Sequence, residues 1–124
     1  MKQTILVVDD REGPRTALRF TFELQYTVLT AKDGLEAEEM IEERRENIAL
    51  VISDINMPYV TGVELVGWIK INHPNIPCIL VSTMSEPIHH GADAFFQKPF
   101  KVNEIRQKVS ELLSRRQSEE PAVS

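Results

Sequence analysis

Short apolar runs alternate with amphipathic segments along most of this chain, and this alternation is the strongest constraint on its fold. Residues Thr4–Val8 and 49–53 form nearly continuous apolar runs of strand length. Such runs are typical of strands that are buried on both faces of a parallel sheet. Three weaker runs of similar length are further candidate strands, at residues 26–31, Cys78–Ser82 and Ala94–Gln97.

The segments between these runs place apolar residues three or four positions apart, which is the spacing of one helix face. Residues 33–36 and 61–64 have the pattern of capping boxes and predict two helix starts. His73 precedes a proline, which predicts the end of the second of these helices. Strands that alternate with helices predict a doubly wound α/β fold, in which a five-stranded parallel sheet carries helices on both faces.

Length and charge narrow the class of protein. The 124 residues suit one domain. We expect it to cover residues 1–116 and to be followed by a flexible tail at 117–124, because "QSEEPAVS" is polar and aperiodic. The net charge of −5 argues against direct nucleic-acid binding, which requires a basic face. A single cysteine, no bilayer-length apolar run and no signal peptide favour a soluble, cytoplasmic protein without membrane insertion.

Carboxylates follow two of the expected strands. Asp9 and Asp10 come directly after Thr4–Val8, and Asp54 comes directly after residues 49–53. In a doubly wound sheet, ligands bind outside the carboxyl ends of the strands, so we expect these three side chains to converge. Three negative charges in one place are costly unless a cation joins them. The sequence therefore predicts a site for a hard divalent cation, Mg²⁺ (or Mn²⁺).

Two further strand ends supply groups that bind phosphate. Cys78–Ser82 ends in the hydroxyl of Ser82, which Thr83 follows, and Ala94–Gln97 runs into Lys98. A carboxylate, a metal, a hydroxyl and a lysine can together transfer a phosphoryl group, because the carboxylate attacks phosphorus while the others bind its oxygens. Each residue alone is explained as well by an ordinary cap, turn or surface charge. Their joint placement favours the functional interpretation.

Four stretches, "VVDD", "ISDINMPYVTG", "ILVST" and "FFQKPF", occur in this order at these strand ends. Together they resemble the receiver domain of bacterial two-component response regulators, over about residues 3–115. The resemblance implies a flavodoxin-like sheet with strand order 2-1-3-4-5. It also implies a receiver that accepts a phosphoryl group from a sensor histidine kinase or a histidine phosphotransfer protein, and then changes the face that binds an unknown downstream protein. Such a receiver promotes its own phosphorylation and dephosphorylation and is not an enzyme that turns over external substrates.

The resemblance also implies a role for each matching residue. The phosphoacceptor would be Asp54, and the Mg²⁺ ligands would be Asp9, Asp10, Asp54 and the backbone carbonyl of Asn56. The remaining roles are the switch hydroxyl of Ser82, the phosphate-pairing amine of Lys98 and the switch aromatic ring of Phe95. Phe96 takes the place of Phe95 if the strand register shifts by one residue. The bond between Lys98 and Pro99 is expected to be cis.

The segment before the last strand departs from the family pattern. Once that strand is counted, roughly eleven residues remain for two loops and a helix, and an average helix alone needs about as many. Pro87 and Gly91 are both unfavourable in a helix interior. We therefore expect helix 4 of the family to be shortened or missing. This departure leaves an alternative function open, a phosphorylation-independent interaction module with the receiver fold.

Other functions fit the residues less well. A phosphohydrolase with an aspartyl nucleophile usually needs a second carboxylate nearby, and the two residues after Asp54 supply none. The first strand–helix loop, "DDREGP", is acidic and lacks the cradle that a nucleotide or flavin phosphate requires. His89 and His90 lie near Asp93, but without helical i, i+4 spacing they do not predict a metal site.

Overall fold

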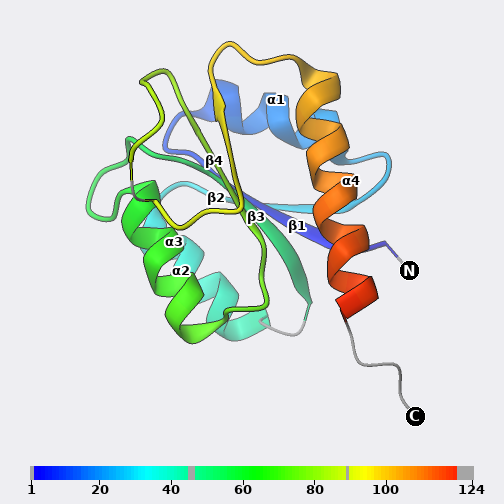
Figure 1. Ribbon diagram of the computed structural model, residues 1–124. Coiled ribbons are helices and arrows are strands. Elements are labelled where there is room, and N and C mark those ends of the chain that lie inside the picture. Colours follow the sequence, from blue (N-terminus) through cyan, green and yellow to red (C-terminus); the bar gives the residue numbers. More distant parts are fainter. Residues whose placement is uncertain (1, 45–46, 89, 120–124) are drawn as a thin grey trace.

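The computed structural model describes residues 2–44, 47–88 and 90–119 of the chain. Its elements are, in order, β1 (Thr4–Val8), α1 (Glu12–Phe22), β2 (Thr27–Ala31), α2 (Gly34–Arg44), β3 (Ile48–Asp54), α3 (Gly62–Asn72), β4 (Cys78–Ser82), β5 (Ala94–Gln97) and α4 (Val102–Glu119). The strands form one sheet in the order β2-β1-β3-β4-β5, and every pair in it is parallel (Figure 1). The predicted doubly wound sheet with strand order 2-1-3-4-5 is therefore confirmed.

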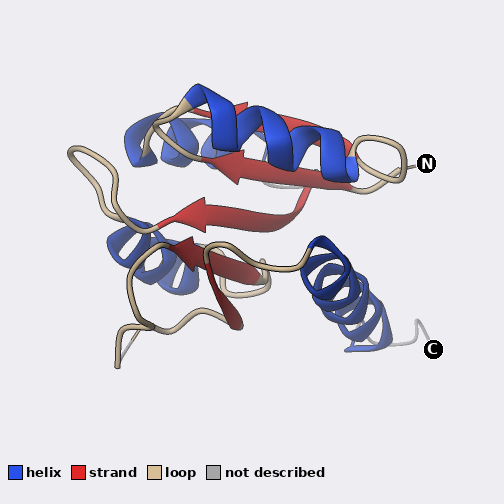
Figure 2. Cartoon of the chain, turned by 90° about the horizontal axis from the view of Figure 1, so that it is seen from above, coloured by secondary structure: helices blue, strands red, loops and turns tan. Residues whose placement is uncertain are grey.

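Helices cover both faces of the sheet (Figure 2). On one face α1 and α4 bury Leu18 and Ile105 against the strands. On the other face α2 and α3 bury Ile41 and Leu65. The central strand β3 is buried along its whole length. Burial on both faces explains why its sequence is almost uninterrupted by polar residues, and it places Asp54 at the end of a rigid element.

The helix starts follow the predicted capping patterns, with one difference. At α3 the Thr61 hydroxyl accepts from the Glu64 amide at 3.1 Å, and the Glu64 carboxylate accepts from the Thr61 amide at 3.0 Å. At α2 Asp33 caps the Glu36 amide at 2.8 Å, but the Glu36 carboxylate accepts from the amide of Lys32 at 3.1 Å. In the capping box of α2, the glutamate therefore reaches the amide one residue earlier than predicted. Both arrangements satisfy amides at the helix start that have no partner within the helix.

No helix occurs in the described part of the β4–β5 connection, residues 83–88 and 90–93, so the label α4 belongs to the helix after β5. This confirms that the fourth helix of the family is missing. Side-chain contacts hold the returning chain instead. The carboxylate of Asp93 accepts from Lys70 Nζ at 2.8 Å and from the Cys78 amide at 2.7 Å. Nδ1 of His90 accepts from the Ala92 amide at 3.0 Å.

The C-terminal helix is longer than expected. The sequence predicts a flexible tail at residues 117–124, whereas α4 continues to Glu119, and residues 120–124 lie outside the described residues. Polar residues such as Gln117 and Ser118 tolerate a helix, and the first sequence signal against one comes only at Pro121. Among the described residues, no helix is both long enough and apolar enough to cross a membrane.

Candidate functional site

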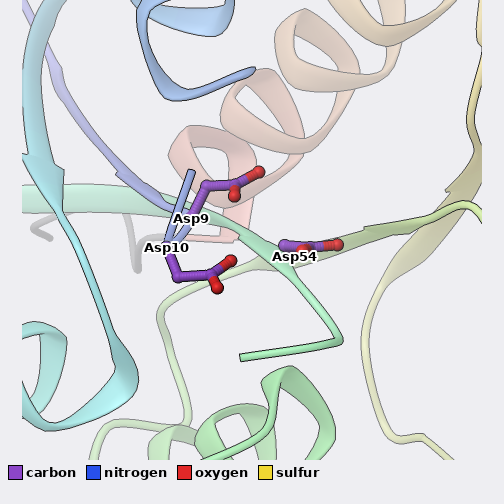
Figure 3. Close-up of side chains that lie close together, drawn as sticks. All are labelled: Asp9, Asp10 and Asp54. Atoms are coloured by element: carbon purple, nitrogen blue, oxygen red, sulfur yellow. The ribbon is translucent and has the colours of Figure 1, made fainter. Parts of the chain in front are cut away.

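Three aspartates meet at the carboxyl edge of the sheet. Asp9 and Asp10 follow β1 and Asp54 ends β3, and carboxylate oxygens of all three lie within 4.8 Å of one another. Figure 3 shows their side chains reaching the same region from the two strand ends. Asp9 and Asp54 are buried, whereas Asp10 is exposed and leaves the cluster open to solvent. The convergence that the sequence predicted is confirmed, and the oxygen donors fit a hard divalent cation.

Asp9 is held by hydrogen bonds on each of its polar atoms. Its amide donates to the Ala31 carbonyl at 3.1 Å, and its Oδ1 accepts from the Arg11 amide at 2.9 Å. Its backbone carbonyl accepts from Arg15 Nη1 at 2.8 Å. Asp9 is not the N-cap of α1, because Arg11 occupies that position without a side-chain cap bond. The orientation of this buried carboxylate is therefore set by the start of the helix and by the neighbouring strand.

Lys98 provides a positive charge beside the acidic cluster. Its Nζ lies 3.4 Å from Asp9 Oδ2 and 3.7 Å from Asp54 Oδ1. Its backbone amide donates to the Ser82 carbonyl at 2.7 Å, which extends the β4–β5 pairing to the edge of the site. The Lys98–Pro99 bond is cis, as predicted. The ammonium thus stands between two of the three carboxylates and offsets part of their mutual repulsion.

The charged form of Asp54 is disfavoured where it lies. Burial raises the pKa of Asp54 above its ordinary value. The charge on Lys98 lowers this pKa and the charges on Asp9 and Asp10 raise it, while the Ile55 amide lowers it. Burial outweighs the ammonium, so the pKa remains raised. A cation or a ligand that brings positive charge to this pocket would relieve the penalty.

Ser82 and Thr83 occupy different environments. Ser82 is fully buried at the end of β4, and its hydroxyl oxygen accepts from the Met84 amide at 3.0 Å. Thr83 is exposed, and its carbonyl accepts from the Gln97 side chain at 3.4 Å. Ser82 is therefore the hydroxyl at the end of a buried strand, beside the residue that leads into Lys98.

Phe95 and Phe96 are both half-buried, on opposite faces of the sheet. Phe95 pairs with Leu80 across the β4–β5 ladder and packs against the core beneath α2 and α3. Its ring centroid lies 6.3 Å from that of His90 in the β4–β5 connection. Phe96 packs on the other face, 6.0 Å from Phe100. This register places Phe95 on the face of the sheet that α2 and α3 cover, beside the β4–β5 connection.

The loop from β3 to α3 brings the helix start against Asp54. The Gly62 amide donates to the Ile55 carbonyl at 2.8 Å, and a Cβ atom at Gly62 would lie 2.2 Å from the Asp54 carbonyl oxygen. Tyr59 has a φ of +68°, and the amide after it donates to the Pro58 carbonyl at 2.8 Å, which closes a γ-turn. Asn56 is exposed in this loop, two residues beyond Asp54.

The sequence interpretation missed Arg11 and Arg15, which bind Asp9 through a backbone amide and a guanidinium. The contact of Arg15 with the Asp9 carbonyl could not be identified from the sequence, because a basic residue six positions after an acidic strand end is a common pattern. For the histidines, His90 pairs with Glu86 at 2.7 Å, and His89 lies outside the described residues. Within the described ranges, the one group of acidic, histidine or cysteine side chains that brings three metal-ligand atoms together is the acidic cluster of Asp9, Asp10 and Asp54.

Comparison with known proteins gives a consistent result. A family model described as the response regulator receiver domain matches residues 5–110. The sporulation initiation phosphotransferase F of Bacillus subtilis is 32% identical over 120 residues, which are 91% of this chain and 95% of that protein. The solved structure of response regulator protein TrrA from Thermotoga maritima, in complex with Mg(2+)-BeF, is 33% identical with a TM-score of 0.81, and the match covers 89% of this chain and 98% of that one.

Many curated relatives are much longer than the matching region. The alkaline phosphatase synthesis transcriptional regulatory protein PhoP of Bacillus subtilis is 30% identical over 129 residues, which are 98% of this chain but 53% of that protein. Across this and six other curated relatives, the chain spans between 9% and 56% of their length. The shared part is therefore one domain of these proteins.

Proposed function

Because this chain belongs to the receiver-domain family of two-component response regulators, we propose that it receives a phosphoryl group on Asp54 and passes on the signal as a change in a partner-binding face. The observation that carries the proposal is the meeting of Asp54 with Asp9, Asp10 and Lys98 at one edge of the sheet. We propose that the receiver domain covers at least residues 1–116, since α4 continues to Glu119.

The acidic cluster is proposed to hold Mg²⁺ (or Mn²⁺) through Asp9, Asp10, Asp54 and the backbone carbonyl of Asn56. The donor set supports this, since hard cations take carboxylate and carbonyl oxygens. The description of the related TrrA structure as a complex with Mg(2+)-BeF supports it as well. When bound, the cation supplies positive charge that stabilises both the ionised carboxylates and the oxygens of an incoming phosphoryl group.

In the proposed reaction an oxygen of Asp54 attacks the phosphorus of a phosphohistidine. A new P–O bond forms, the P–N bond breaks, and the donor imidazole leaves with the bonding electrons and takes a proton from solvent. Lys98 is positioned to pair with an equatorial phosphoryl oxygen, and the Ser82 hydroxyl to donate to another. These two groups act by positioning and by stabilising charge, which is the main protein contribution to phosphoryl transfer.

The signal is proposed to leave the site through Ser82 and Phe95. Movement of the hydroxyl toward the phosphoryl group would free space for the half-buried ring of Phe95 to change its rotamer. The proposed donor is a sensor histidine kinase or a histidine phosphotransfer protein in the cytoplasm. The proposed target is a downstream protein, with no direct nucleic-acid binding and no membrane insertion. The domain would promote its own phosphorylation and dephosphorylation without turning over other substrates.

Acetyl phosphate with Mg²⁺ tests the proposal directly. The wild-type chain should gain the mass of one phosphoryl group, and Asp54→Asn should gain none. Asp33→Asn is the matched control, because it changes another aspartate to asparagine at the start of α2, where either residue caps a helix. A wild-type chain that gains no mass, where a receiver of known activity does, would exclude phosphoryl acceptance. Labelling that persists in Asp54→Asn would assign it to another residue.

The missing helix favours one alternative, an interaction module that works without phosphorylation. In the described part of residues 83–93 there is no helical face to carry a signal. Once a partner has been isolated, its affinity for wild type, for Asp54→Ala and for the beryllofluoride-treated protein separates the two functions. Equal affinity in all three cases favours the module, and a change with beryllofluoride that is lost in Asp54→Ala favours the switch.

A further inference from the structure

We propose that Arg15 is a positioning residue for the metal site, and that it acts through the backbone of Asp9 rather than by touching the cation. This inference rests on the proposed divalent-cation site. Arg15 is the fourth residue of α1, and its Nη1 donates to the Asp9 carbonyl at 2.8 Å. Asp9 is itself fully buried, so this carbonyl depends on the protein for its partner.

The peptide that Arg15 holds is the one that joins the two adjacent aspartates. Its carbonyl belongs to Asp9 and its N–H to Asp10, and the peptide group is planar. A bond that fixes the direction of the carbonyl therefore fixes the plane of the whole group. That plane determines where the Cα of Asp10 lies relative to Asp9, and so how the two carboxylates diverge. One guanidinium thus controls the relative placement of two proposed metal ligands.

Regular sheet pairing does not fix the orientation of the peptide group between Asp9 and Asp10. β1 ends at Val8, so Asp9 lies just beyond the ladder that orders the preceding residues. Its amide still reaches Ala31, but its carbonyl is held by Arg15. The N-cap residue of α1 adds a second contact, from the Arg11 amide to Asp9 Oδ1. The helix start thereby holds both the backbone and the side chain of this ligand.

The choice of a carbonyl as acceptor suits a metal site. A guanidinium bound to a carboxylate would compete for the oxygens that a cation needs, as Lys98 does at 3.4 Å from Asp9 Oδ2. Arg15 instead brings its positive charge close to the cluster while leaving the carboxylate lone pairs available. Groups that orient metal ligands typically change metal affinity by about 10- to 100-fold when they are removed.

The test is a titration of the purified 124-residue chain with Mg²⁺, in which the amide NMR signals of Asp9 and Asp10 report binding. Arg15→Met should raise the Mg²⁺ dissociation constant about tenfold, and Arg15→Lys, which keeps the charge and one donor, should raise it less. Arg19→Met is the matched control, because Arg19 lies one turn further along α1 and its contacts are with Glu23 and Phe20 at the surface. It should bind Mg²⁺ as the wild type does.

A purely structural role for Arg15 predicts a different result. In that case Arg15→Met would lower the free energy of unfolding measured in EDTA but leave the Mg²⁺ affinity of the folded protein unchanged. That outcome overturns the proposal. In phosphorylation by acetyl phosphate, the proposal predicts a higher half-saturating Mg²⁺ concentration with an unchanged rate at saturation. If Arg15→Met does not fold, Arg15→Lys against Arg19→Lys decides, and equal affinities refute the proposal. A wild type that binds no Mg²⁺ refutes the metal site itself.

Discussion

Replacement of Gly62 by alanine should destabilise the fold at the point where the start of α3 meets the end of β3. The added Cβ would lie 2.2 Å from the Asp54 carbonyl oxygen, 2.8 Å from Ile55 Cα and 2.9 Å from the Asp54 carbonyl carbon. All three atoms belong to the backbone, so no side-chain rotation can relieve the contact. Overpacking in a well-packed interior typically costs 1–3 kcal/mol, and we expect Gly62→Ala to lower the free energy of unfolding by about 3 kcal/mol.

Gly67→Ala in the same helix provides the matched comparison. Gly67 is exposed in the interior of α3, and a Cβ atom there would meet nothing within 4 Å. Because alanine is the better helix former, this change should raise the free energy of unfolding by about 1 kcal/mol. The same substitution within one helix is thus expected to have opposite signs, and the two variants should differ by about 4 kcal/mol.

Urea unfolding measures both effects. Trp68 is the single tryptophan of the chain and lies half-buried in α3, so its fluorescence reports on the helix concerned. The unfolding midpoint of Gly62→Ala should fall by on the order of 1 M urea or more. If Gly62→Ala is as stable as the wild type, α3 does not approach Asp54 as closely as described, and the account of this edge of the site fails.

Four further variants test the charges at the site and the contacts that hold the β4–β5 connection. Asp54→Asn should raise the free energy of unfolding at pH 7, because burial raises the pKa of Asp54 in the folded state and so disfavours its charged form. The gain in stability should be full above that raised pKa and should disappear as the pH falls below the ordinary value of 3.8. A pH series of urea unfolding in which the gain persists at low pH contradicts this prediction. Asp93→Ala should cost about 2 kcal/mol, because the buried Cys78 amide loses its charged acceptor. Lys70→Met should cost only about 1 kcal/mol, because the ion pair with Asp93 and the hydrogen bond to the Ile76 carbonyl that it breaks are partly solvated. Equal losses in urea unfolding would show that the contacts of Lys70, and not the Cys78 amide contact, hold the β4–β5 connection. Mg²⁺ at ten times its dissociation constant should stabilise the wild type by about 1.4 kcal/mol, and Asp10→Asn should lose most of this gain in thermal melts.

Local sequence signals were sufficient where neighbouring residues determine the structure. The Thr61 cap, the end of α3 before Pro74 and the absence of a helix between β4 and β5 all depend on residues close in the chain. The sequence signals for the end of a helix were weaker where no proline or glycine directly follows it. The end of α4 was therefore predicted at residue 116, whereas the helix extends to Glu119. A capping pattern also does not specify which amide the glutamate reaches, and the Glu36 carboxylate accepts from the backbone amide of Lys32 instead of that of Asp33.

The sequence by itself placed five side chains at the last residue of a strand or just after it, those of Asp9, Asp10, Asp54, Ser82 and Lys98. A parallel sheet then brings all such strand ends to one edge. Only the tertiary structure decided that Lys98 lies between two carboxylates and that burial outweighs its charge at Asp54. It alone showed Arg15 on the Asp9 carbonyl. The reason is that the alternation of strands and helices follows from the periodicity of apolar residues, whereas distances of a few ångströms depend on how whole helices pack against the sheet.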